Sequence, residues 1–162
     1  MTHKQLVKRG GLWLRNTLHC GVVMEEFTAC VLSNEIPDVI GWNQNRCILV
    51  ECKASRADFR ADQKKPHRNP IRASLGSWKF YLAPPGLIDP DELPVGWGLY
   101  EVHDRHVRHA GGAKYENARV PPFASCKQSE VGLLLSALRR LKISTCVYVR
   151  EIENKCEEVE WI

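Results

Sequence analysis

The stretch that decides the fold is IPDVIGWNQNRCILVECK, residues 36–53, in which two apolar runs flank a short polar segment. The runs 36–42 and 47–52 are rich in β-branched and large apolar residues, which favour strands. Residues 43–45 between them are Asn-Gln-Asn, a composition typical of turns. This pattern predicts a β-hairpin, in which the length of the loop sets the pairing of the two strands.

The acidic residues of this hairpin are expected to meet. If the loop is residues 44–45, or 43–46, the numbers of paired residues sum to 89, and Asp38 lies directly opposite Glu51. An odd-length loop would break this register. Glu51 and Lys53 are two residues apart on one strand, so their side chains leave the same face while Cys52 points to the other.

The same register assigns apolar side chains to both faces of the hairpin. One face would carry Val39, Ile48, Val50 and Cys52, and the other, which it shares with the two acids, would carry Ile40, Trp42, Cys47 and Leu49. Because both faces are apolar, we expect these strands to lie in the centre of a sheet with layers on both sides.

Around this hairpin, the sequence predicts one domain spanning residues 1–162. We expect a helix over 3–18 with Leu6, Leu12, Trp13 and Leu18 inward, and a first strand over 22–31. Ser55 and Asp58 predict a helix start after the hairpin, and further strands are expected over 78–83 and 97–102. A last helix is expected to pack on the sheet through Val131, Leu134, Leu135, Leu138 and Leu141, followed by a strand over 145–152.

Composition points to a soluble cytoplasmic protein. Of 162 residues, 44% are hydrophobic and 26% charged, and no apolar run reaches the length of a membrane span. No export signal is visible at the N-terminus. The seven cysteines form no CxxC pair, so we interpret them as reduced core residues, although a zinc site assembled from distant Cys and His stays open. The histidines at 103, 106 and 109 are interpreted as a polar hairpin.

Positive charge gathers after the hairpin. The segment 60–80 contains six basic residues against Asp62 alone, whereas the tail over 151–160 is acidic. This segment is either a solvated loop or a track for phosphates. The candidates for nucleic-acid contacts are Arg56, Lys64, Lys65, Arg68 and Arg72, with Trp78 as a ring that either stacks on a base or packs in the core.

Pro37-Asp38, followed after a turn by Glu51-Cys52-Lys53 and then a helix, resembles the PD-(D/E)XK nuclease superfamily. The surrounding segments 35–42 and 50–59, together with 81–86 and 96–99, resemble a phage-borne or MmcB-like branch of that superfamily, over roughly residues 20–102. The resemblance implies an α/β fold with a restriction-endonuclease-like α-β-β-β-α-β core, in which helices flank a mixed central sheet. A surface hairpin with an ion pair is the alternative explanation of the motif.

The resemblance also implies a chemistry. Asp38 and Glu51 would hold Mg²⁺ or Mn²⁺, with the carbonyl of Cys52 as a backbone ligand, and Lys53 would orient the attacking water or stabilise developing charge. Many members of the superfamily add an acid from the first helix, yet residues 3–18 contain none. We expect Glu26 rather than its neighbour Glu25 to fill this gap.

The expected function is therefore metal-dependent hydrolysis of phosphodiester bonds in DNA, in repair, recombination or a mobile element. The DNA could be single-stranded or branched, and a homodimer is a further expectation for an enzyme that cuts two strands. A nucleic-acid-binding protein with the same fold and no catalysis is the alternative. A structural or regulatory protein would leave the convergence of Asp38, Glu51 and Lys53 unexplained.

Overall fold

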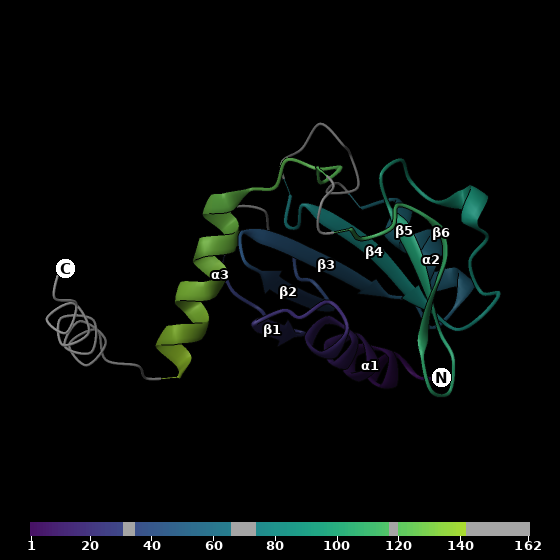
Figure 1. Ribbon diagram of the computed structural model, residues 1–162, viewed down its shortest axis with the longest axis horizontal. Helices are drawn as coiled ribbons and strands as arrows, with labels where there is room; N and C mark the ends of the chain where they lie inside the picture. Colours follow the sequence, from purple (N-terminus) through teal and green to yellow (C-terminus); the bar gives the residue numbers. More distant parts are fainter. Residues whose placement is uncertain (31–34, 66–73, 117–119, 142–162) are drawn as a thin grey trace, which may run out of the picture.

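The computed structural model describes residues 1–30, 35–65, 74–116 and 120–141, and it has an α/β architecture (Figure 1). Its centre is a mixed sheet of six strands in the order β1-β2-β3-β4-β5-β6. β1 (Val22–Glu25), β2 (Val39–Asn43) and β3 (Arg46–Cys52) are successively antiparallel. β4 (Trp78–Ala83) and β5 (Gly98–Val102) continue in parallel with β3, and β6 (Val107–Gly112) returns antiparallel to β5.

The predicted hairpin register is confirmed. Val39 pairs with Val50, Gly41 with Ile48 and Asn43 with Arg46, so the numbers of every pair sum to 89. The loop consists of two residues, of which Gln44 has a φ of 53°, the left-handed conformation that tight hairpin turns need. Because this loop has an even length, the apolar alternation of both strands stays in phase.

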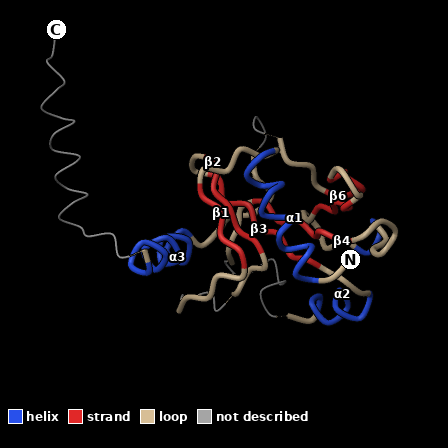
Figure 2. Tube along the Cα trace, turned by 90° about the horizontal axis from the view of Figure 1, so that it is seen from below, coloured by secondary structure: helices blue, strands red, loops and turns tan. Residues whose placement is uncertain are grey.

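Both faces of the sheet are covered, as the hairpin pattern predicts. On one face Val39, Val50 and Cys52 join a core cluster with α1 (His3–Asn16). On the other face Ile40, Leu49 and their neighbours pack with residues that include Phe59 of α2 (Arg56–Gln63) and Leu133 of α3 (Lys127–Arg140). In Figure 2, α1 lies in front of the strands that it covers. β3 therefore has its acidic end inside the protein.

α2 begins at its predicted cap, and α1 begins after a capping box at Thr2. The Thr2 hydroxyl accepts a hydrogen bond from the Gln5 backbone amide, and the Gln5 side-chain oxygen accepts one from the Thr2 backbone amide. The Ser55 hydroxyl accepts from the Asp58 amide. The burial of Leu6 and Trp13 agrees with the prediction, but Leu12 is 42% exposed because the inward stripe passes through Gly10, Gly11 and Leu14 instead.

Two strand predictions were too long and one helix prediction was wrong about packing. β1 ends at Glu25, because Glu26 has a φ of 45° and leaves the strand conformation. β2 starts at Val39, leaving Ile36 exposed. α3 forms, but it lies beyond the β1 side of the sheet in Figures 1 and 2. Of the predicted inward stripe, Leu134 packs partly buried against the core, whereas Val131, Leu135, Leu138 and Leu141 are exposed, and Leu133 is the fully buried leucine. The strand expected over 145–152 lies outside the described residues.

No helix in the described ranges has both the length and the apolar character needed to cross a membrane.

Candidate active site

The candidate site forms where β2 begins and β3 ends. Asp38 directly precedes β2, and the next pair in the confirmed register would join it to Glu51. A carboxylate oxygen of Asp38, Oδ2, accepts a hydrogen bond from the Cys52 amide at 2.7 Å. The Cys52 thiol packs in the core on the α1 side, so Cys52 contributes only its backbone to the site, as the alternation predicts.

Lys53 is the centre of this cluster. Its ammonium lies 3.0 Å from Oε2 of Glu51 and 4.0 Å from Oδ2 of Asp38. The side chain is only 3% exposed, and its backbone amide donates to Leu82 O at 2.9 Å, which fixes the position after β3 against β4. The structure thus brings together the three residues that the sequence predicts as catalytic.

A third buried carboxylate, which the sequence prediction missed, completes the cluster. Asp62 of α2 is 1% exposed, and its Oδ1 lies 3.1 Å from the Lys53 ammonium. Its other oxygen accepts a hydrogen bond from the Tyr81 hydroxyl at 2.9 Å. The only local signal was its spacing three residues after Phe59, which places both on the inward face of α2.

The protonation behaviour of the cluster follows from burial and crowding. Burial and the nearby charge of Glu51 raise the pKa of Asp38 from its ordinary 3.8 to about 6, although Lys53, the Cys52 amide and His3 oppose this shift. Burial disfavours the charged form of Lys53, but the carboxylates of Glu51, Asp62 and Asp38 outweigh it and raise the pKa of the amine. Lys53 is therefore a cation at neutral pH.

The Glu26 carboxylate lies on the solvent side of the same site. Its backbone amide donates to Asp38 O at 2.8 Å, and its side chain reaches Nε2 of His3 at 3.3 Å. The same nitrogen lies 3.6 Å from Oδ1 of Asp38. Glu25 instead lies against Gly11 of α1. The structure thus places Glu26, and not Glu25, beside Asp38, together with His3, a residue the sequence prediction did not consider.

The charge of the cluster is suited to a divalent cation. Three carboxylates, those of Asp38, Glu51 and Asp62, surround one buried ammonium, and Lys65 reaches Asp62 at 2.9 Å from a half-exposed position. Burial, with the nearby charge of Glu51, raises the pKa of Asp38, and a hard cation bound by carboxylate oxygens would favour the charged form. The described part of the chain contains no group of three or more His, Cys, Asp or Glu side chains arranged to hold a metal ion. A bound metal ion would therefore have to be held by Asp38, Glu51 and the Cys52 carbonyl alone.

The residues predicted to contact nucleic acid have different outcomes. Arg56 is engaged with Glu92 at 2.7 Å, and Lys64 and Lys65 lie exposed at the end of α2. Trp78 is 2% exposed and packs against Phe80 and Tyr115, so the prediction that its ring stacks on a base is wrong. Arg68 and Arg72 lie outside the described residues.

The histidines belong to a hairpin, as predicted. The His103 backbone amide donates a hydrogen bond to His106 O at 2.9 Å in the turn between β5 and β6, and the two imidazole rings stack with their centroids 4.9 Å apart. His109 lies on β6 and packs edge-on against Tyr100. The prediction missed that residues 107–112 form a full edge strand.

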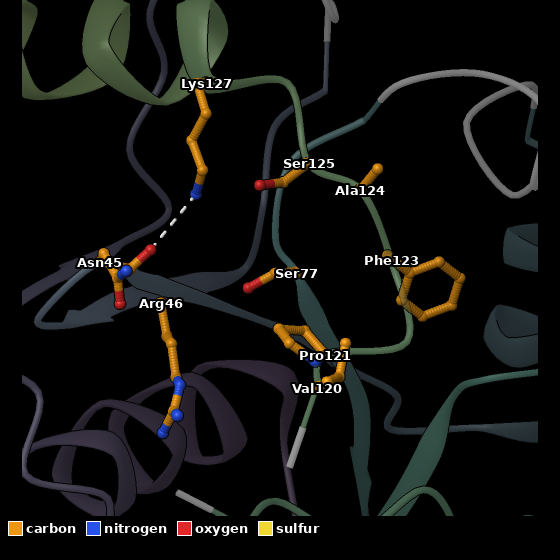
Figure 3. A pocket seen from close by; sticks show the side chains of 9 residues that line it. All are labelled: Asn45, Arg46, Ser77, Val120, Pro121, Phe123, Ala124, Ser125 and Lys127. Atoms are coloured by element: carbon orange, nitrogen blue, oxygen red, sulfur yellow. Dashed lines mark hydrogen bonds between the residues drawn. The ribbon is translucent and has the colours of Figure 1, made fainter. Parts of the chain in front are cut away.

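A cavity of about 540 Å³ lies at the opposite end of β3 from the acids (Figure 3). Its walls include Arg46, at the start of that strand, Phe123 and Ser125. The one lysine in the wall, Lys127, is bound to Glu130 at 2.9 Å and donates to the Asn45 carbonyl at 3.4 Å. Since Arg46 and Cys52 are the two ends of the seven-residue strand β3, this cavity is about 20 Å from the candidate site and is not part of it.

Comparison with known proteins gives a fold and no function. No family model matches the chain, and a search of curated proteins gave no significant match. A solved structure described as the SPO1766 protein of unknown function from Silicibacter pomeroyi is similar, with a TM-score of 0.57. It is 24% identical in sequence, and the similarity covers 88% of this chain and 90% of that one. The similarity supports the α/β fold of the chain.

Proposed function

We propose that this protein is a nuclease that hydrolyses phosphodiester bonds in DNA with the help of Mg²⁺ or Mn²⁺. The observation that carries the proposal is the meeting of Asp38, Glu51 and Lys53 at adjacent strand ends, with the ammonium 3.0 Å from Glu51. The order of elements, α1, three antiparallel strands, α2 and a parallel strand, supports the restriction-endonuclease-like core that the sequence motif implies.

In this proposal Asp38 and Glu51, with the carbonyl of Cys52, hold the metal ion. The bound ion would supply Lewis-acid polarisation of the phosphate and a water of lowered pKa. Asp38 must lose its proton to serve as a ligand, and its raised pKa of about 6 allows this at neutral pH. The Cys52 amide keeps Oδ2 of Asp38 oriented.

Lys53 has the role of stabilising negative charge on the phosphate as the bond to the attacking oxygen forms. Its ammonium is buried and permanently charged, which strengthens its interaction with an anion in a site of low dielectric constant. Asp62, held by the Tyr81 hydroxyl, offers Lys53 a partner that does not depend on Glu51. The amine can therefore leave Glu51 without becoming an unpaired buried charge.

The test is incubation of the purified protein with labelled linear, single-stranded and branched DNA in the presence of Mg²⁺, Mn²⁺ or EDTA. We expect cleavage that EDTA, Asp38→Asn and Lys53→Met abolish. Asp58→Asn is the matched control, because Asp58 lies on α2 and its amide serves the Ser55 cap. Cleavage that persists in folded Asp38→Asn would refute the assignment.

One observation favours a second candidate, a nucleic-acid-binding protein without catalysis. Lys53 already lies within 3.1 Å of both Glu51 and Asp62, so the amine partly neutralises the acids in the way that a bound metal would. Metal-independent DNA binding without cleavage of any of the three substrates would establish this alternative and refute the nuclease.

A further inference from the structure

The excess of positive charge on α1 equals the formal net charge of the whole chain. The sequence has 23 Lys and Arg residues against 19 Asp and Glu, a formal net charge of +4. α1 alone contains four of these cations, Lys4, Lys8, Arg9 and Arg15, and no acid. The remaining basic and acidic residues are equal in number. Such a local excess is the electrostatic footprint expected of a surface that meets a polyanion.

Three of the four cations form a row on the exposed side of α1. At 100° per residue, Lys4, Lys8 and Arg15 fall within an arc of about 40°. All three are exposed, whereas the opposite side of the helix is buried against the sheet. In the described part of the chain, none of the three side chains makes an ion pair or hydrogen bond. The fold therefore leaves their charge available.

Arg9 is different, because it serves the fold. Its guanidinium donates to the carbonyls of His103 and Asp104 at 2.8 Å each, which ties α1 to the turn between β5 and β6. The basic row thus lies on a helix that is anchored at both its buried face and its flank. A rigid support of this kind lowers the entropy cost of binding.

The row starts at the candidate active site. His3, the residue before Lys4, lies 3.6 Å from Asp38 and 3.3 Å from Glu26 through the same ring nitrogen. From Lys4 to Arg15 the helix rises about 16 Å, a length that corresponds to roughly five phosphates of one strand of a duplex. A shallow cavity of about 440 Å³, lined by residues that include Lys8 and Leu12, borders the row.

We infer that the exposed face of α1 formed by Lys4, Lys8 and Arg15, called here the α1 basic row, binds the sugar-phosphate backbone of duplex DNA and leads it to the site at Asp38. The choice of DNA over RNA depends on the proposed function, but the electrostatic argument does not. Contacts of this kind position the substrate and do not read its sequence.

The experiment measures binding and not cleavage. The full chain is titrated in EDTA against a short fluorescent DNA duplex, and fluorescence anisotropy is recorded over a series of salt concentrations. The variant Lys4→Gln, Lys8→Gln, Arg15→Gln is compared with the charge-matched control Arg108→Gln, Lys114→Gln, Arg139→Gln, in which three exposed basic residues outside α1 lose the same charge. Thermal unfolding checks that both variants fold.

Affinity for DNA falls as salt rises, and each lost phosphate contact makes the slope of log affinity against log salt less steep by about 0.9. We expect the slope of the α1 variant to be less steep than that of the wild type by about two to three units, and that of the control by less than about one. Equal slopes for the two variants would overturn the inference, and tighter binding of an RNA duplex of the same sequence would overturn the choice of DNA. If the α1 variant shows the less steep slope but the wild-type protein cleaves none of the DNA substrates, the nuclease proposal is refuted and the DNA-binding role of the α1 basic row stands.

Discussion

Replacing Asp62 with Asn tests whether the buried cluster is held together as the distances indicate. The substitution keeps the size of the side chain but removes the charge that lies 3.1 Å from the Lys53 ammonium. Breaking a buried ion pair costs about 3–5 kcal/mol when the remaining charge has no partner. Lys53 keeps Glu51 at 3.0 Å, so we expect a smaller loss in the free energy of unfolding, about 2–3 kcal/mol.

The other contacts of Asp62 change the expected loss in the free energy of unfolding only slightly. The pair with Lys65 involves a half-exposed ammonium and contributes at most about 1 kcal/mol. The Tyr81 hydroxyl can still donate to the amide oxygen of Asn, so its hydrogen bond survives. The loss should therefore come from the interaction with Lys53.

Urea unfolding followed by tryptophan fluorescence measures the effect. Asp62→Asn should lower the urea midpoint without changing the m-value, whereas Asp58→Asn, the same change on the same helix, should cost about 0.5 kcal/mol. In a Lys53→Met background the cost of Asp62→Asn should fall by at least about half, because the pair is already broken. Equal costs for the two Asp variants, or an undiminished cost in the Lys53→Met background, would refute this reasoning.

Three further predictions concern other parts of the molecule. Because the pKa of Asp38 is raised from 3.8 to about 6 in the folded protein, the native state holds a proton between these values that the unfolded chain has lost. Stability should therefore fall by about 2 kcal/mol from pH 4 to 6, and Asp38→Asn should flatten this slope in urea titrations at each pH. Leu133→Ala should lower the free energy of unfolding by about 2–4 kcal/mol, measured by thermal unfolding, and Leu138→Ala by under about 1 kcal/mol, because Leu133 is buried and Leu138 is exposed. Equal losses for the two variants would mean that the predicted α3 stripe lies in a core. Arg9→Ala should speed amide exchange in the turn 103–106, with Lys8→Ala as the unaffected neighbour, because two carbonyls lose their donor.

Sequence reasoning succeeded where the information is local. The two-residue turn at Gln44 and the alternation of apolar residues over 39–52 fix the hairpin register, which fixes the position of Asp38 relative to Glu51. Ser55 fixes the start of α2 through a hydrogen bond within one turn of helix. These features depend on neighbours at most a few residues away in the chain or in the hairpin.

The features that were missed depend on tertiary placement. Asp62 reaches Lys53 because α2 packs on the sheet, and His3 reaches Asp38 because α1 packs on the other face. The spacing of Asp62 after Phe59 indicates only an inward side chain, and nothing in the sequence around His3 marks it as part of a site. The leucine stripe of α3 has good helical periodicity, but periodicity cannot tell that Leu133, outside that stripe, is the residue that joins the core.

The central claim, that Asp38 and Glu51 bind one catalytic divalent cation, is tested most directly by calorimetric titration of Mn²⁺ into the metal-free protein near neutral pH. The account predicts saturable binding of one ion per chain in the wild type, lost in Asp38→Asn and in Glu51→Gln but kept in Asp58→Asn. Absence of binding to the folded wild type, or binding that both site variants retain, would contradict it.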